Sequence, residues 1–262
     1  MKARWMIGSM AVLMLATAPA YCQSVANVDI MGDDDVTTAT NFGAGNPAVT
    51  YSGQGAYEDT GNDFWNTYGE SDNFAVKGLT ASDGATDTGW FLEAIDPGPL
   101  PVRGGQYYGT TGLISSNTLM DDGSQIRGED FGPVGPLEWI ISGLQNDLEY
   151  TLYLYGASNE WTDPGVCCAN ERLQVEITDA SGTFDASPLG AVEANAEIFD
   201  LDQNYTITEG IMPVDGEIII SQVVRSNSSS DFAGFQIIEI PEPTTMVLLG
   251  LGGLGLIRRR RA

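Results

Sequence analysis

The stretch LEYTLYLYG, residues 148–156, decides the fold class of this chain. Its side chains alternate in character, which is the period of a β-strand. The two faces are formed by Tyr150, Leu152 and Leu154 and by Thr151, Tyr153 and Tyr155. Both faces carry large side chains, so we expect a sheet that is either covered on both sides or presents aromatic rings outward.

Segments of the same kind recur on both sides of this stretch and are rich in β-branched and aromatic residues. They are residues 47–51, 73–79, 89–95, 137–144, 173–178, 204–211, 217–224 and 232–240. Clusters of Gly, Asn, Asp and Pro separate them, as is typical of turns. Residues 189–199 are the one candidate for a short helix. The pattern predicts an all-β fold, a jelly-roll-like β-sandwich with long loops.

The N-terminus has the pattern of a secretory signal peptide. Two basic residues, Lys2 and Arg4, precede a mostly apolar stretch at residues 6–18, and small residues follow it. We therefore expect a signal-peptide helix over residues 1–22, which signal peptidase removes.

The C-terminus is a tail in three parts. These are the tripeptide Pro241, Glu242 and Pro243, the apolar run Met246 to Ile257, and the basic block Arg258, Arg259, Arg260 and Arg261. A helix that crosses a hydrocarbon core needs roughly 20 apolar residues, whereas the run supplies twelve. We expect this run to form a short hydrophobic helix that inserts only marginally, with the arginines holding its end on the cytoplasmic side. A permanent tail anchor and a hydrophobic terminal strand are the alternatives.

Together and in this order, the three parts closely resemble the PEP-CTERM sorting signal. The resemblance implies an exported protein of a Gram-negative bacterium that makes exopolysaccharide, with a tail that an inner-membrane exosortase recognises and cleaves. It implies transient inner-membrane anchoring, followed by a place at the cell surface or outside the cell. The expected organisation is a signal peptide at 1–22, a β-sandwich domain at 23–240 and a sorting signal at 241–262.

The body carries a resemblance of its own. The segments that carry it are VTYSGQGAYEDTGNDFWN at 49–66, DLEYTLYLYG at 147–156 and DFAGFQIIEI at 231–240. Together they look like the β-sandwich bodies of PEP-CTERM proteins, which are similar to galactose-binding-like jelly rolls. The resemblance implies this architecture and a role in binding carbohydrate or a surface.

The body is also strongly acidic. The whole chain has a formal net charge of −25, but residues 23–240 hold five basic and 35 acidic residues, a net charge of −30. Such a charge repels nucleic-acid phosphates and anionic lipid surfaces. We therefore expect no nucleic-acid partner, and an extracellular setting rich in divalent cations.

Few residues of this chain are of the types that commonly act in catalysis. Histidine is absent, which excludes Ser-His-Asp and Cys-His mechanisms and His-based metal sites. Cys167 and Cys168 are adjacent, and a vicinal disulfide, a dimer-forming pair and simple burial are all open. A carboxylate pair, as in polysaccharide-active enzymes, is the remaining catalytic alternative, but no local sequence marks one. We expect a protein without catalytic activity.

The clustered acidic side chains are better suited to calcium binding than to catalysis, because Ca²⁺ prefers carboxylate and carbonyl oxygens in Gly-, Asn- and Asp-rich loops. In the loop YEDTGND, the first candidate ligands are Glu58, Asp59 and Asp63. Galactose-binding-like sandwiches frequently hold a structural calcium near the chain ends, and that resemblance implies as further candidates Asp33, Asp35 and Asp231. Solvated acidic loops that keep the protein soluble are the alternative.

Sugar binding needs aromatic ring faces for stacking and polar groups for the hydroxyls. The candidates in Gly-, Asp- and Asn-rich segments are Trp65, Tyr107, Tyr108 and Trp161. Burial in the sandwich is the alternative for Trp65. By contrast, Trp90 and Trp139 lie in strand-like apolar segments and are expected in the core.

The sequence thus predicts an exported, non-catalytic protein of the cell surface or exterior. We expect signal peptidase and an exosortase to process it, and an exopolysaccharide matrix to be its surroundings. The alternative is a calcium-dependent carbohydrate-binding module, and a polysaccharide-active enzyme is the third hypothesis.

Overall fold

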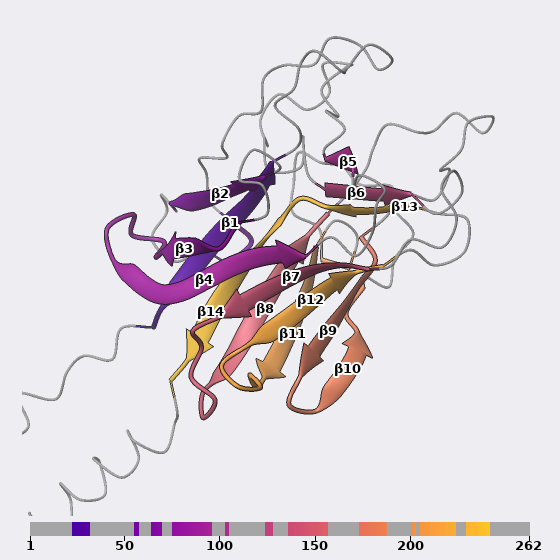
Figure 1. Ribbon diagram of the computed structural model, residues 1–262. Helices are drawn as coiled ribbons and strands as arrows, with labels where there is room; N and C mark the ends of the chain where they lie inside the picture. Colours follow the sequence, from indigo (N-terminus) through magenta and orange to yellow (C-terminus); the bar gives the residue numbers. More distant parts are fainter. Residues whose placement is uncertain are drawn as a thin grey trace, which may run out of the picture.

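The computed structural model describes residues 23–31, 55–57, 64–69, 75–95, 103–104, 124–127, 136–156, 173–187, 201–202, 205–223 and 229–241. Every regular element within these ranges is a β-strand. Figure 1 shows two main sheets that lie face to face. The predicted all-β sandwich is therefore confirmed, whereas the expected terminal helices and the candidate helix at 189–199 lie outside the described residues.

The first sheet has five strands in the order β11-β8-β14-β1-β2. Their bounds are Tyr205–Ile211 for β11, Glu149–Tyr155 for β8, Gly234–Ile240 for β14, Val25–Met31 for β1 and Trp65–Gly69 for β2. Neighbours run antiparallel except for β1 and β2, which run parallel. The last strand of the body, β14, therefore lies at the centre of this sheet, between β8 and β1.

The second sheet has six strands in the order β10-β9-β12-β7-β4-β3, and all neighbours are antiparallel. Their bounds are Gly182–Asp185 for β10, Val175–Asp179 for β9, Ile218–Gln222 for β12, Leu137–Ser142 for β7, Asp87–Ile95 for β4 and Lys77–Thr80 for β3. A small third sheet joins Ser229–Phe232 (β13), Ser124–Arg127 (β6) and Arg103–Gly104 (β5).

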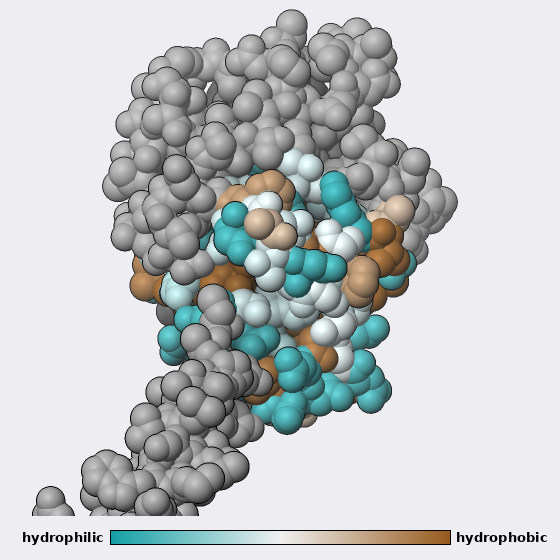
Figure 2. Space-filling view, turned by 90° about the vertical axis from the view of Figure 1, so that its left-hand side faces the viewer, coloured by the Kyte–Doolittle hydropathy of each residue, from teal (hydrophilic) through white to brown (hydrophobic). Residues whose placement is uncertain are grey.

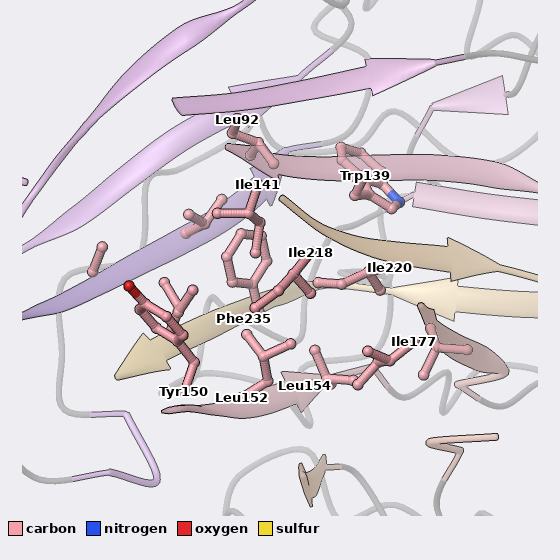
Figure 3. Packing of buried hydrophobic residues seen from close by; sticks show 14 of the residues in the cluster. Leu92, Trp139, Ile141, Tyr150, Leu152, Leu154, Ile177, Ile218, Ile220 and Phe235 are labelled. Carbon is pink, nitrogen blue, oxygen red and sulfur yellow. The ribbon is translucent and has the colours of Figure 1, made fainter. Parts of the chain in front are cut away.

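The core lies between the two main sheets, because each strand turns every second side chain inward. One face of β8 is wholly enclosed, since Tyr150, Leu152 and Leu154 are each 0% exposed. In Figure 3, Leu152 and Leu154 lie across from Ile218 and Ile220 of the other sheet. Burying a large apolar side chain in this way stabilises the fold by roughly 1.5–3 kcal/mol.

Aromatic rings join the two sheets inside this core. Tyr68 meets Trp139 edge to face, and Trp90 meets Tyr150 in the same way, each pair with ring centroids 5.8 Å apart. Trp90 is 3% exposed and Trp139 is 2% exposed. The prediction that these two tryptophans belong to the core is confirmed.

Tight turns close the ends of the strands, and one of them requires a glycine. Gly143, directly after β7, has a φ of +82°, which L side chains rarely adopt. A Cβ atom there would also overlap the carbonyl oxygen of Gly89. The close approach of β4 and β7 at this point therefore depends on the missing side chain.

Some strands do not stand out in the sequence. In β1 the outward-facing Asn27 and Asp29 are polar but 0% exposed, which obscures the usual alternation. The strand β2 begins at Trp65, in a Gly-, Asp- and Asn-rich segment where the sequence predicts no strand. Residues 232–240, predicted as one strand, are divided between β13 and β14 by Ala233, whose N–H donates to the Tyr155 carbonyl at 2.9 Å.

Candidate functional site

The predicted calcium ligands lie almost entirely outside the described residues. This applies to Asp33, Asp35, Glu58, Asp59 and Asp63. The backbone of Asp231 lies in β13, opposite Gln125 of β6. Within the described ranges, no three His, Cys, Asp or Glu side chains gather in a group that could hold a metal ion.

Of the predicted sugar-stacking rings, Tyr107, Tyr108 and Trp161 lie outside the described residues. Trp65 is described, and it is only 3% exposed. Its ring meets the ring of Tyr155 edge to face, with centroids 6.1 Å apart. This burial makes Trp65 a packing residue of the five-stranded sheet, because a pyranose could not reach its ring face.

The expected sorting signal begins where the sandwich ends. Ile240 is the last residue of β14 and pairs with Glu149 of β8, and Pro241 follows directly. Pro241 is half-buried, and the remainder of the expected signal, Glu242, Pro243 and the four arginines, lies outside the described residues. The body and the signal are therefore joined without intervening residues.

Both ends of the body meet at this point. Val25 of β1 pairs with Ile238 of β14, and the N–H of Glu239 donates to the Ser24 carbonyl at 2.9 Å. Figure 1 shows β1 beginning and β14 ending at the same end of the sandwich. The sequence contains the segments but does not reveal this pairing, because Asn27 and its partner Gln236 lie 209 positions apart in the chain.

Glu239, the penultimate residue of β14, is a buried carboxyl group. It is 5% exposed and stands opposite Tyr150 of β8. Burial raises the pKa of the Glu239 carboxyl above its ordinary value of 4.5. Burial also raises the pKa of Tyr150 to about 12; a hydrogen bond from Gln145 opposes this rise, and the charge of Glu239 adds to it.

A second candidate site lies on the outer face of the same sheet, where the segment Gly55–Tyr57 is held down by Gln236. The Gln236 Oε1 accepts from the Tyr57 N–H at 3.0 Å and from the Tyr155 hydroxyl, which itself accepts from the Ala56 N–H at 2.9 Å. Its Nε2 donates to the Tyr57 carbonyl at 3.2 Å and to Asn27 Oδ1 at 2.9 Å. A Cβ atom at Gly55 would overlap the Gln236 amide, so a side chain there would displace this amide from its hydrogen-bond partners.

Beside this segment, Tyr57, Tyr153 and Tyr205 form what we call the tyrosine cluster. All three are half-buried. The ring centroids are 5.8 Å apart for Tyr57 and Tyr153 and 6.3 Å apart for Tyr153 and Tyr205. Burial raises the pKa of Tyr153, and its two ring neighbours add to the rise. The cluster matches the outward-facing aromatic side chains that the alternation in residues 148–156 predicts.

Other surfaces of the described residues are mixed in character. Figure 2 shows hydrophilic and hydrophobic residues interspersed on the face turned to the viewer. Large apolar side chains are exposed at a few positions, and the most exposed is Val76, at 58%. Folded proteins commonly expose some apolar surface, so these residues by themselves mark no site.

Comparison with known proteins bears on one of these sites. A family model described as the PEP-CTERM protein-sorting motif matches residues 239–261. No match to a curated protein was found. The matched segment starts inside β14 and runs through the tripeptide, the apolar run and the arginines. The chain therefore carries a PEP-CTERM sorting motif, which supports export and processing through an exosortase system.

Proposed function

We propose that this protein is a non-catalytic component of an exopolysaccharide matrix, delivered to the cell surface or the exterior. Signal peptidase removes residues 1–22, the C-terminal tail anchors the chain transiently in the inner membrane, and an exosortase then cuts that tail. The sorting motif at residues 239–261 carries this proposal. The motif overlaps the last two residues of β14 and continues beyond it, which supports a body that folds outside the membrane.

Composition supports the non-catalytic role. The chain has no histidine, so the common nucleophilic and His-based metal mechanisms have no general base or ligand. The net charge of −30 over residues 23–240 favours neutral partners over anionic ones, because like charges repel. A neutral or weakly charged polysaccharide fits this body better than nucleic acid or anionic lipid.

The proposal is tested by comparing the location and processing of the protein in two strains of its native host, the parent strain and a strain from which the exosortase gene is deleted. In the parent strain we expect the protein outside the inner membrane, without its tail, in the fraction that sediments with exopolysaccharide. In the deletion strain we expect the precursor in the membrane fraction. Identical processing and identical distribution in both strains would refute the proposed route.

The tyrosine cluster favours a second candidate function, a calcium-dependent carbohydrate-binding module on a galactose-binding-like jelly roll. Aromatic rings at a surface provide the apolar faces on which pyranose rings stack. Affinity electrophoresis in gels containing neutral polysaccharides, with and without a chelator, tests it. Binding that falls at least tenfold in Tyr153→Ala or Trp161→Ala would support the module. The matched control is Phe91→Ala, which removes an exposed ring from the other sheet.

Calcium is tested separately by thermal unfolding. Ligand binding to the folded state alone raises stability by RT ln(1 + [L]/Kd). We expect millimolar CaCl₂ to raise the Tm more than NaCl at the same ionic strength, because site binding adds to screening of the acidic body. The candidate ligands are Glu58, Asp59 and Asp63. A melting curve that CaCl₂ does not change would refute calcium binding.

A further inference from the structure

We propose that the tail is cut on the carboxyl side of Ile240, so that the mature protein keeps β14 complete. The processing enzyme then acts on a motif attached directly to the end of a packed central strand. This inference rests on the proposed processing by an exosortase, and it adds where the cut falls and which part of the chain the folded body withholds from the enzyme.

The position of β14 in its sheet carries the argument. From Gly234 to Ile240 every residue of β14 pairs with β8, and from Gly234 to Ile238 the strand also pairs with β1. An enzyme that binds its substrate as an added strand needs a free strand edge. From Gly234 to Glu239 neither edge of β14 is free, so the bonds on the amino side of Ile240 are withheld from such an enzyme.

The residues just before the motif are also packed by their side chains. Ile237 and Ile238 are 0% and 1% exposed, and Glu239 is 5% exposed. The Glu239 N–H is bound to the Ser24 carbonyl. To reach any bond on the amino side of Ile240, an enzyme would have to detach the strand from both neighbours and expose this part of the core.

If the chain is cut before it folds, the cut must still lie after β14 for the sheet to form in full. Removal of residues from Ile237 onward would take two buried isoleucines from the centre of the five-stranded sheet and leave Ser24 without its partner. A large-to-small change in a core is already destabilising, and loss of part of a central strand removes ladder hydrogen bonds as well. A body that retains Ile240 keeps every residue pair between β14 and β8.

Pro241 is the first residue after β14, and from this residue on the chain is accessible to the processing enzyme. Proline has no backbone N–H, so it cannot extend the ladder of a central strand. The motif match nevertheless begins at Glu239, two residues earlier. The matched segment thus has a structural part, Glu239 and Ile240, and a part beyond the sheet that begins at Pro241.

The reaction is hydrolysis of one peptide bond. The bond between a carbonyl carbon and the next amide nitrogen breaks; water supplies the hydroxyl of the new C-terminal carboxyl group and the hydrogen of the new amine on the released tail. An acceptor other than water would add its own mass to the C-terminal peptide without moving the position of the cut.

Mass spectrometry of C-terminal peptides tests the position. The protein is taken from the surface and medium fractions of the native host. We expect peptides that end at Ile240 or later and none that end within Gly234–Glu239. A mature end before Ile240 would overturn the inference while leaving processing intact. Recovery of only full-length chains would instead refute the processing on which the inference rests.

An insertion tests whether the cut follows the motif. Four residues, Gly-Ser-Gly-Ser, are placed between Ile240 and Pro241, and the matched control carries them between Ser181 and Gly182 in the exposed β9–β10 turn. We expect the first variant to be cut at the same bond relative to Pro241, with a body four residues longer and a precursor half-life no longer than that of the parent chain. A cut that stays at a fixed distance from β8, or a precursor half-life more than doubled in the first variant alone, would contradict the inference.

Discussion

Gln236 makes more side-chain hydrogen bonds than its place in an apolar strand suggests. Its amide binds both the N–H and the carbonyl of Tyr57, the Tyr155 hydroxyl and Asn27. It is 0% exposed, so water cannot replace these partners. A single amide side chain thereby fixes a loop segment over the outer face of the five-stranded sheet.

Replacing Gln236 by Leu should lower the free energy of unfolding by about 2–4 kcal/mol, because several buried donors and acceptors lose their partner. Urea unfolding followed by tryptophan fluorescence measures it. The matched control is Tyr153→Phe, which removes a hydroxyl for which the described residues supply no hydrogen-bond partner, and which should change stability by less than about 0.5 kcal/mol. Equal stability of the Gln236 variant and the parent protein would show that these bonds contribute nothing.

The buried Glu239 predicts a pH dependence of stability. Its pKa is higher in the folded than in the unfolded protein, so the folded state holds this proton more tightly. The resulting stabilisation is fully present below the ordinary carboxyl pKa and is lost as the pH rises through the folded pKa. Glu239→Gln, which cannot ionise, should therefore have a higher Tm than the parent protein at pH 7.

This Tm difference should shrink towards zero as the pH is lowered below about 4. Melting curves of the two proteins between pH 3.5 and 7.5 measure it. The control, Glu217→Gln, removes one charge at an exposed position. A Glu239→Gln advantage that stayed constant over this range would contradict the sign of the shift.

Among the elements, β8 and β14 lie at the centre of the five-stranded sheet. The contribution of β14 to the free energy of unfolding can be measured by truncating one of its side chains. Ile237→Ala should cost about 2–4 kcal/mol, because it leaves a cavity at a fully buried position opposite Leu152. Ile207→Ala, on the edge strand β11 and only half-buried, should cost less than about 1.5 kcal/mol. Equal costs in urea unfolding would mean that β14 is not the central packing strand.

The elements also show what the sequence could and could not predict. Strands with one apolar face, such as β4, β7, β8 and β12, follow from alternation alone. The strands β1 and β2 do not, because their buried polar side chains are satisfied by distant groups: Asn27 Nδ2 donates to the Phe64 carbonyl at 3.0 Å, and Asn66 Nδ2 donates to the Thr80 carbonyl at 2.8 Å. Such partners come from tertiary structure and leave no local signal.

The features of the candidate sites also fall into those that the sequence predicts and those that it does not. The sorting motif is contiguous in sequence, so the sequence alone identifies it. The place of Ser24 beside Glu239, the docking of Gly55–Tyr57 and the tyrosine cluster all join segments far apart in the chain. For Trp65 the sequence leaves both sugar stacking and burial open, and its ring contact with Tyr155 is the physical reason that it is buried.

On the scale of the whole molecule, charge and topology act together. The end of the sandwich at which β14 stops carries exposed carboxylates, at Asp147, Glu149, Asp215 and Glu217. These residues are gathered by the β8–β14 pairing and by bonds such as that from the Gly216 N–H to Asn146 Oδ1 at 2.7 Å. Anionic lipid headgroups repel such an end, which favours release of the body once the tail is cut.

In the proposed topology, the arginine block places positive charge on the cytoplasmic side of the membrane. Replacing Arg258 to Arg261 by serine should let the short apolar run pass through the membrane, because nothing then holds its end in the cytoplasm. We expect uncut precursor in the medium, at several times the parent level on immunoblots. Lysine at the same four positions is the control and should be processed normally. Normal cutting and location of the serine variant would show that the block is not a stop signal.

The central claim is that an acidic β-sandwich leaves the cell and loses both of its terminal segments on the way. Intact-mass measurement of the protein from cytosolic, membrane and external fractions of its native host tests this claim directly. We predict an external species that begins close to Gln23 and ends at or shortly after Ile240, with the longer forms confined to the membrane. A full-length chain of 262 residues found as the main species in the cytosol would contradict the account.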